Sequence, residues 1–428
     1  MIEKALISRL IYEGWEKTEK KMVTRTEIQT AKKYMNYKEV LTISGIRRSG
    51  KTYLMYLLMK QLMDNDVTKE NIFYINFEDE RLIFLETKDL ETIYQTLLEH
   101  STGSGKIYLF LDEIQNVSGW EKWIARMYEK NIKFIVSGSN ASLLSSEFST
   151  ALTGRNVLLE LHPFSFKEFI HLQNDRIDLE QVRHLTEKRV EMKKLFKSYG
   201  KKGGFPEVVL EDKEDILHQY YRDILYRDVI TRYKIKRIES LEKLAFYLLT
   251  NTSALTSFYN LRKMLDININ TIKNYVVYLE KAYLIERVPL FSYSVKQQIY
   301  NPFKIYCTDI GLRNAIAFKF SEDYGKLSEN IVFTELKRRN KEVYYWKESH
   351  GKEVDFLIKE GRDVKQLMQV CWDIDDEKTT KREREGLIRG MTMFNLKEGL
   401  ILTDDYEGEE TIDDKKIIYQ PIWYWLLR

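Results

Sequence analysis

Eight residues near the start of the chain have the types and spacing of a phosphate-binding loop. Gly45-Ile46-Arg47-Arg48-Ser49-Gly50-Lys51-Thr52 reads G-x-x-x-x-G-K-T and follows the apolar run Val40–Ser44. Glycines at both ends let such a loop fold back so that its backbone N–H groups point to one centre, which suits phosphate oxygens. The helix expected at Tyr53–Met63 adds its free N–H groups and the positive end of its dipole. The predicted phosphate-binding residues are Gly45, Arg47, Arg48, Ser49, Gly50, Lys51 and Thr52.

Within this loop, Lys51 is expected to reach the β- and γ-phosphates of a nucleotide, and Thr52 to offer its hydroxyl to Mg²⁺. A glycine-rich turn that matches by chance is the alternative. A second motif argues against it, because Asp112 and Glu113 follow the apolar run Ile107–Leu111. Such a run predicts a strand of a parallel sheet, and ligands of open α/β sheets bind at the carboxyl ends of the strands.

The acidic pair has a chemical role in this arrangement. Asp112 is predicted to hold Mg²⁺ through its water shell, and Glu113 to polarise the attacking water as general base. Many strands simply end in a solvated acidic turn, so the pair alone is weak. Its combination with the phosphate-binding loop favours the catalytic interpretation.

Two further residues are candidates for contacts with the γ-phosphate. Asn140 ends the run Ser137-Gly138-Ser139-Asn140 after the fourth expected strand, where a polar side chain can sense the γ-phosphate or the attacking water. A cap of the following helix explains Asn140 about as well, and both roles are compatible. Arg155 precedes the fifth expected strand, where it can reach transition-state charge within the chain or across a subunit boundary. A surface ion pair is the alternative for Arg155.

The elements that position these residues alternate between strands and helices. Strands are expected at Val40–Ser44, Asn71–Phe77, Lys106–Leu111, Ile132–Ser137 and Val157–Leu161, with helices that include Tyr53–Met63, Leu90–His100 and Trp120–Glu129. This alternation predicts a parallel sheet flanked by helices. The fold class is therefore α/β, with a P-loop NTPase sheet of the type that contains an additional strand. We predict a P-loop ATPase domain at 1–165, a helical lid at 166–235, a winged helix-turn-helix at 236–318 and a small restriction-endonuclease-like α/β domain at 319–428.

The winged-helix prediction rests on three helices followed by a strand. The helices are expected at Leu241–Leu249, Leu255–Leu265 and Asn270–Tyr283, and the strand at Ile285–Leu290. Residues 236–300 contain nine basic and five acidic side chains, a balance of +4 that permits contacts with DNA phosphates. Lys273 on the third helix is a candidate for such a contact. A packing or partner-binding module is the alternative.

The C-terminal segment carries a reduced form of a nuclease metal site. Glu335 on a helix and Asp355 on a strand are two carboxylates of the kind that bind Mg²⁺, but the third element reads Gln369-Val370-Cys371 where E-x-K would be needed. An amide replaces a carboxylate, and a thiol replaces the lysine. Nuclease activity is therefore not expected, and a domain used for binding or packing is favoured.

Composition limits the classes that remain. The chain has 428 residues, 31% of them charged, and a net charge of only +3, so any nucleic-acid-binding patch must be local. Cys307 and Cys371 lack metal-ligand spacing, which predicts reduced thiols and a cytoplasmic protein. No apolar run is long enough to span a membrane, and no signal peptide is apparent.

The pattern as a whole resembles the prokaryotic, especially archaeal, AAA-type ATPases that join an ORC-like P-loop module to a winged helix and a C-terminal domain of unknown function with a restriction-endonuclease-like core. The matching stretches, besides the motifs above, are Asn76–Leu82, Leu152–Arg155, His162–Phe166, Gly203–Glu207 and Gly351–Phe356. The resemblance implies ATP binding, ATP hydrolysis and a cytosolic setting. Relatives that cleave DNA would carry Glu and Lys at positions 369 and 371, so the resemblance does not restore nuclease activity.

These observations predict an ATPase that uses its nucleotide state to control binding of duplex DNA or a protein partner, with self-association as a further possibility. The alternative is a nucleotide-dependent switch or scaffold with negligible turnover. Glu113 argues mildly against that alternative, because a pure switch needs no catalytic carboxylate.

Overall fold

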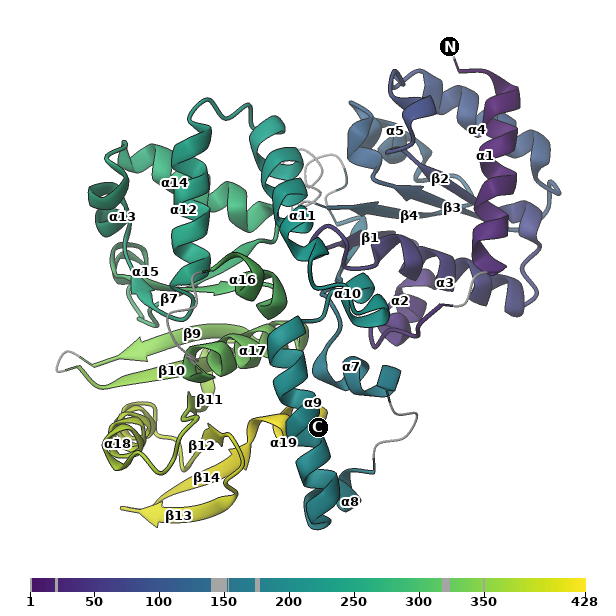
Figure 1. The fold of residues 1–428 in the computed structure, drawn as a ribbon. Helices are drawn as coiled ribbons and strands as arrows, with labels where there is room; N and C mark the ends of the chain where they lie inside the picture. Colours follow the sequence, from purple (N-terminus) through teal and green to yellow (C-terminus); the bar gives the residue numbers. More distant parts are fainter. Residues whose placement is uncertain are drawn as a thin grey trace. The chain divides into compact units, whose positions relative to one another are not determined.

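The computed structural model of the chain describes residues 2–19, 22–139, 152, 154–173, 178–317, 324–348 and 351–428. The chain forms two compact units, Met1–His162 and Pro163–Arg428, and each is described by itself (Figure 1). Within the described ranges, the helices are all too short or too polar to cross a lipid bilayer. Asn140 lies outside the described residues.

A parallel five-stranded sheet forms the centre of the first unit. Its strands are β1 (Val40–Ser44), β2 (Ile72–Asn76), β3 (Ile107–Asp112), β4 (Ile132–Gly138) and β5 (Asn156–Glu160), arranged in the order β2-β3-β4-β1-β5. β4 therefore lies between the strand that precedes the P-loop and the strand that carries the acidic pair. This order confirms the predicted α/β fold class with an additional strand. It brings the carboxyl ends of β1, β3 and β4 to one edge of the sheet.

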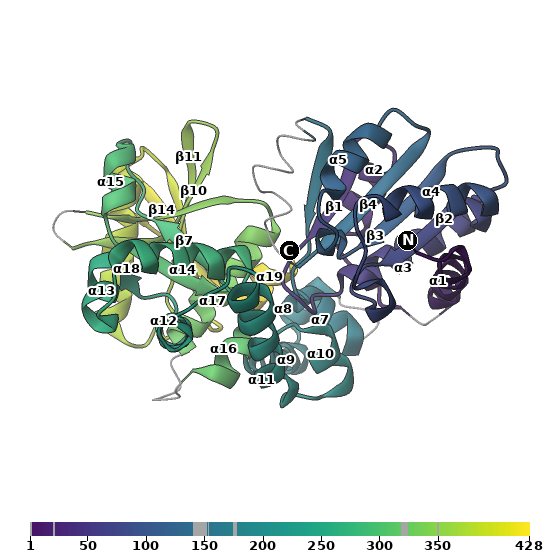
Figure 2. The same cartoon turned by 90° about the horizontal axis from the view of Figure 1, so that it is seen from above.

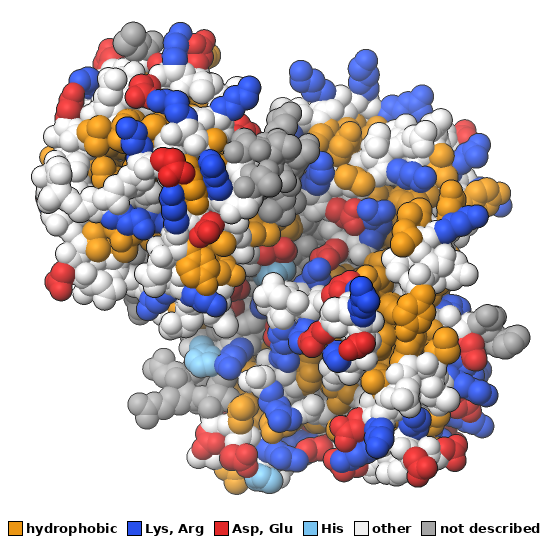
Figure 3. Space-filling model, turned by 180° about the vertical axis from the view of Figure 1, so that it is seen from behind, with side chains coloured by type: hydrophobic (Ala, Val, Ile, Leu, Met, Phe, Trp, Pro, Cys, Tyr) orange, Lys and Arg blue, Asp and Glu red, His pale blue; other side chains and the backbone are white. Residues whose placement is uncertain are grey.

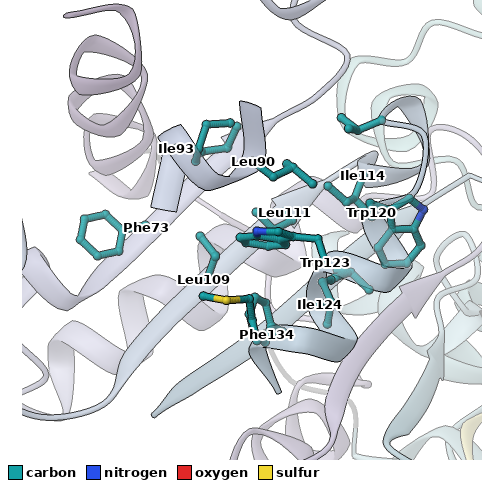
Figure 4. Packing of buried hydrophobic residues seen from close by; sticks show 14 of the residues in the cluster. Phe73, Leu90, Ile93, Leu109, Leu111, Ile114, Trp120, Trp123, Ile124 and Phe134 are labelled. Atoms are coloured by element: carbon teal, nitrogen blue, oxygen red, sulfur yellow. The ribbon is translucent and has the colours of Figure 1, made fainter. Parts of the chain in front are cut away.

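Helices cover both faces of this sheet. They are α1 (Lys4–Glu16), α2 (Ile28–Met35), α3 (Lys51–Asp64), α4 (Asp89–His100) and α5 (Trp120–Met127). In Figure 1, α4 and α5 lie above the sheet and α2 and α3 below it. Because successive strand residues point to opposite faces, the strands β1 to β4 each contribute to two apolar clusters. Phe110 packs beneath the sheet with residues of α2 and α3. Above the sheet the neighbouring strand positions meet α4 and α5, and the residues of this cluster include Phe73, Leu90, Leu109, Trp123 and Phe134 (Figure 4).

The second unit begins with helices. They are α7 (Phe166–Gln173), α8 (Leu179–His184), α9 (Thr186–Lys202), α10 (Pro206–Glu211) and α11 (Ile216–Asp223), and α11 continues as a π-helix over Ile224–Thr231. Gly203 ends α9 with a φ of +73°, and a Cβ there would lie 2.3 Å from Asp309 Oδ1. Gly203 thus ends a helix and also allows the chain to come close to the segment at Asp309.

Four helices and three short strands follow. They are α12 (Ile238–Thr250), β6 (Leu255–Thr256), α13 (Phe258–Leu265), α14 (Ile269–Lys281), β7 (Ile285–Pro289), α15 (Val295–Tyr300) and β8 (Phe303–Cys307). The strands form an antiparallel sheet in the order β6-β8-β7. The sequence predicts a helix from Leu255, but Leu255 and Thr256 pair with β8 instead. The helix begins only after Ser257, whose side chain accepts a hydrogen bond from Asn260 N.

A mixed six-stranded sheet completes the second unit. Its elements are α16 (Ile310–Ile316), α17 (Tyr324–Arg338), β9 (Glu342–Lys347), β10 (Glu353–Glu360), β11 (Asp363–Val370), α18 (Glu377–Met393), β12 (Glu398–Thr403), β13 (Gly408–Ile412), β14 (Lys415–Pro421) and α19 (Ile422–Leu427). The strand order is β13-β14-β12-β11-β10-β9, with β12 parallel to both of its neighbours. Leu387 and Met391 of α18 pack in one apolar cluster with Leu357, Leu367 and Ile401 of the strands.

Candidate nucleotide-binding site

The loop between β1 and α3 has a backbone conformation that requires glycine at two positions. Gly45 has a φ of +147°, and a Cβ at this position would lie 2.1 Å from Leu161 O, just after β5. Gly50, with a φ of +100°, ends the loop and caps α3 without a side chain. Both predicted glycines therefore occupy positions where a side chain would strain the backbone. The loop is held against the end of β5, because Leu161 N donates a 2.7 Å hydrogen bond to Ser44 O.

Lys51 places a positive charge against this loop. Its side chain is almost completely buried, and Nζ donates hydrogen bonds to Gly45 O at 3.0 Å and to Ile46 O at 3.1 Å. The long side chain thus folds back over the loop from the first turn of α3. An ammonium at this place, together with the amino end of a helix, favours bound phosphate.

Arg25 supports the loop from outside. It is 4% exposed, and its guanidinium donates to Ser49 O at 2.9 Å and to His162 O at 2.7 Å. One side chain therefore joins the P-loop to the segment after β5. No motif in the sequence marks Arg25, since it lies in the segment before α2 and meets the loop only in the folded chain.

Asp112 ends β3 beside Thr52. Thr52 Oγ1 donates to Asp112 Oδ2 at 2.6 Å, and Tyr74 OH donates to the same oxygen at 2.8 Å. Ser137 Oγ donates to Asp112 Oδ1. Three hydroxyl groups from α3, β2 and β4 thus orient one buried carboxylate. The structure brings together Thr52 and Asp112, the two residues predicted to hold Mg²⁺. Hard oxygen donors of this kind fit that ion.

Glu113 follows in a left-handed backbone conformation, with a φ of +52°. Its N–H donates to Ser137 Oγ at 3.2 Å, while its carboxylate accepts from Ser139 N at 3.3 Å and from Gln115 Nε2. Burial raises the pKa of Glu113 above its usual value, and the charge of Asp112 acts in the same direction, while that of Lys51 opposes it. A carboxylate with a raised pKa is a stronger base than an ordinary surface glutamate.

Two of the predicted arginines, Arg47 and Arg155, contact groups outside the P-loop. Arg47 NH1 forms an ion pair with Glu78 Oε1 at 2.8 Å. Arg155 lies at the amino end of β5, where its carbonyl accepts from Val40 N at 2.9 Å and its guanidinium lies 5.0 Å from the centre of the Tyr128 ring. The P-loop follows the opposite end of β1, roughly 16 Å away for five residues of strand. Arg155 is therefore not brought to the P-loop of its own chain, and a role across a subunit boundary stays a prediction.

A second charged cluster lies in the C-terminal unit. Lys304 of β8 is 3% exposed, and its Nζ lies 2.9 Å from Glu329 Oε1, 3.0 Å from Glu353 Oε1 and 2.8 Å from Asp355 Oδ1. Although burial opposes it, the pKa of Lys304 is held well above its usual value by the carboxylates of Asp355 and Glu329. Burial raises the pKa of Glu329 to about 8, and the charge of Asp355 adds to this shift.

This cluster corrects the residue assignment made from the sequence. Glu335 pairs with Arg338 at 3.2 Å and Arg339 at 2.8 Å, and Glu329 takes the expected place near Asp355. Gln369 Oε1 accepts from Asp355 N at 3.0 Å. Among the described residues, no three His, Cys, Asp or Glu side chains have the arrangement of a metal site. The cluster does not fit a divalent ion, because the ammonium of Lys304 already lies between its carboxylates.

Several residues around the P-loop were therefore not predicted from the sequence. Ser137 is the residue before the last in β4, so its position next to Asp112 follows once β4 is known to neighbour β3. Tyr74 gave no signal, since its hydroxyl reaches Asp112 only because β2 pairs with β3. Gln115 lies two residues after Glu113, and only the left-handed turn directs it back to that carboxylate.

Comparison with known families agrees with this geometry. Residues 37–170 match the family model described as AAA domain, which contains the P-loop, Asp112 and Glu113. Residues 193–323 and 324–423 match two domains of unknown function (DUF8612 and DUF4143). The fold and the site thus define a P-loop protein with a nucleotide-binding AAA domain.

Two relatives resemble the chain over most of its length. It is 34% identical to "Uncharacterized protein MJ1544" of Methanocaldococcus jannaschii, covering 99% of this chain and 96% of that protein. It is 32% identical to an "Uncharacterized protein" of Haemophilus influenzae, covering 90% and 94%. The chain belongs to the same family as these two proteins. Among solved structures, AMPPCP-bound DnaA from Aquifex aeolicus matches with 16% identity over 61% of this chain and 90% of that chain, at a TM-score of 0.27 that carries no functional argument.

Proposed function

We propose that the protein is an ATPase that hydrolyses ATP with Mg²⁺. One observation carries this proposal: Lys51, Thr52, Asp112 and Glu113 converge at the carboxyl edge of the parallel sheet. Lys51 supplies the charge for the phosphates, and the Thr52–Asp112 pair supplies oxygen donors for the cation. Glu113, with its raised pKa, is the candidate base for the attacking water. The bound cation would neutralise charge that develops on the phosphates.

The surrounding hydrogen bonds prepare these residues for that task. Three hydroxyl donors fix the orientation of the Asp112 carboxylate before any ligand binds. The Glu113 carboxylate is held by Gln115 Nε2 and Ser139 N at the ends of neighbouring strands. A base that is already positioned needs little reorganisation when water and nucleotide arrive.

The second unit is proposed to contain a lid at 166–235, a winged helix-turn-helix at 236–318 and a restriction-endonuclease-like domain at 319–428. The order α12, β6, α13, α14, β7, β8 and the β6-β8-β7 sheet support the winged-helix assignment. Lys273 and Asn274 of α14 are exposed, as a recognition helix requires. Tyr278 of the same helix is stacked on Tyr233 at 3.8 Å between ring centres, so that ring is used for packing.

Control of DNA or of a protein partner by the nucleotide state is the further part of the proposal. Positive and negative side chains are interspersed on the face shown in Figure 3, so a DNA-binding surface on that face would be local. The third segment is proposed to serve binding or packing. Nuclease activity is not proposed, because Lys304 lies where a metal would need the carboxylates.

The first test is steady-state ATP hydrolysis by the full-length protein, with and without duplex DNA, compared with Lys51→Ala. We expect Mg²⁺-dependent turnover that is lost in the variant, and stimulation by DNA if the winged helix transmits DNA binding. Turnover retained in Lys51→Ala would contradict the proposed site. Tight ATP binding without turnover in either condition would replace the ATPase with a nucleotide-dependent switch, and a protein partner would then be sought.

A further inference from the structure

One cavity in the C-terminal unit has the features of a ligand site. The cavity has a volume of about 790 Å³, and most of its lining residues belong to α9, α16 and α17. These three helices pack on one another, and their ribbons lie close together in Figure 2. Its described lining contains four basic side chains, three aromatic rings and no Asp or Glu. This combination differs from the neighbouring cavity around Lys304, whose lining is rich in carboxylates. A cavity of this size holds a small organic molecule.

Arg313 of α16 is the strongest indication of what would bind. It is 8% exposed, and no carboxylate in the described part of the chain lies within ion-pair distance of it. NH1 donates to Asn314 Oδ1 at 3.3 Å and NH2 to Thr250 O at 3.4 Å, both long and both to neutral acceptors. Nε has no hydrogen-bond partner among the described atoms. A buried guanidinium without a counter-ion is costly, and a bound anion would offset that cost.

Three lysines add positive charge around the same cavity. Lys201 and Lys202, at the end of α9, pair with Glu214 at 2.9 Å and with Asp212, carboxylates that do not line the cavity. Such exposed pairs contribute little and exchange readily for another anion. Lys197, one turn earlier, is exposed and has no ion pair in the described residues. The charge around the cavity is thus complementary to an anion.

Aromatic rings form another part of the wall. Trp372 lies between Phe196 and Tyr324, with ring centres 6.1 Å and 5.3 Å away and the rings inclined by 26° and 19°. This nearly parallel row joins α9 and α17 to Trp372, which lies two residues after the end of β11. Flat apolar surface of this kind favours a ligand that contains a planar ring.

We propose that this cavity binds a phosphorylated small molecule with a planar ring, of the nucleotide class, through Arg313 and Lys197 for the phosphate and the Phe196–Trp372–Tyr324 row for the ring. The site is separate from the P-loop and does not depend on the proposed ATPase activity. A guanidinium binds phosphate through paired hydrogen bonds, which explains an arginine at the buried position and lysines at the exposed ones.

The test is calorimetric titration of full-length Lys51→Ala protein with AMP, since this background weakens the P-loop site. We expect one AMP site that is weakened at least tenfold in both Arg313→Met and Lys197→Glu. The second variant alters an exposed residue, so it keeps the test valid if the first does not fold. The matched control, Lys263→Met on the exposed face of α13, should bind AMP as the parent does. Trp372→Leu should also weaken AMP binding.

Three results would overturn the proposal. The first is no AMP binding by the Lys51→Ala protein. The second is AMP binding that is unchanged in both Arg313→Met and Lys197→Glu. The third is inorganic phosphate that binds as tightly as AMP, which would remove the role of the aromatic rings.

Discussion

Thr52 Oγ1 lies 2.6 Å from Asp112 Oδ2, and this hydrogen bond joins the start of α3 to the end of β3 across 60 residues of sequence. A cation bound to both oxygens would fix the P-loop and the acidic strand in one geometry. The same contact explains why two motifs that are far apart in the chain behave as one site.

Replacing Asp112 with Asn keeps the size of the side chain and removes its charge. We expect the magnesium affinity measured in the ATPase assay to fall by about 10- to 100-fold. The Mg²⁺ concentration that gives half-maximal turnover reports this change. Asp64→Asn, at the exposed end of α3, is the charge-matched control and should leave the value unchanged. An unaltered magnesium requirement in Asp112→Asn would remove this residue from the cation site.

Glu113→Gln separates chemistry from binding. We expect turnover to fall by about 10²- to 10⁴-fold, because the amide cannot accept the proton of water. ATP binding, measured by titration calorimetry, should persist. Retained hydrolysis would exclude Glu113 as the base.

The pH dependence of ATP hydrolysis by the parent protein gives an independent check on Glu113. A base acts only when it is deprotonated, and the pKa of Glu113 lies above its usual 4.5. Activity should therefore decline as the pH falls, starting above the pH at which an ordinary glutamate titrates. A profile of kcat/KM against pH measures this acidic limb, and a limb centred at or below 4.5 would contradict the assignment.

Arg25 is expected to act through the shape of the P-loop. Arg25→Met leaves Ser49 O and His162 O without their buried donors, at a cost of about 1–3 kcal/mol for each unpaired group. The melting temperature should fall and KM for ATP should rise. Arg25→Lys can restore one of the two donors, so its melting temperature and its KM for ATP should lie between those of the parent and of Arg25→Met. Equal KM values in all three would show that Arg25 does not position the loop.

The raised pKa of Glu329 predicts that the stability of the protein depends on pH in an unusual range. Its pKa in the folded protein is about 8, against an ordinary value of 4.5, so between these values the folded state holds a proton that the unfolded state releases. The free energy of unfolding contributed by this group therefore decreases as the pH rises from 4.5 to 8. Urea unfolding across this range should show the decrease in the parent and a shallower one in Glu329→Gln. Identical slopes would mean that Glu329 stays ionised beside Lys304.

Lys273 tests the winged-helix proposal. If α14 contacts DNA, Lys273→Ala should weaken duplex binding and reduce the salt slope, log K against log salt, by about 0.9 for one lost phosphate contact. Fluorescence anisotropy at several salt concentrations measures both quantities. Lys60→Ala, exposed on α3 in the first unit, serves as control. A salt slope equal to that of the parent would exclude the contact.

The phosphate-binding loop, the acidic pair and the α/β sheet that carries them could be predicted from the sequence. These features depend on local rules: glycine at strained positions, apolar runs for buried strands, and short connections between alternating elements. Val40–Ser44 and Asn156–Glu160 accordingly lie within a residue or so of their predicted bounds.

The side chains that surround these motifs could not be predicted in this way, because they depend on the tertiary fold. Arg25, Tyr74 and Ser137 reach the site through strand pairing and loop closure that no local pattern encodes. The same holds for Lys304. It lies on β8, and its ammonium lies between carboxylates that belong to later segments of the chain. Glu329 and Glu335 are separated by less than two helical turns, and their different partners follow from which side of α17 faces β8. The chemistry of a residue type can be read from sequence, but its neighbours depend on contacts between segments that are far apart in the chain.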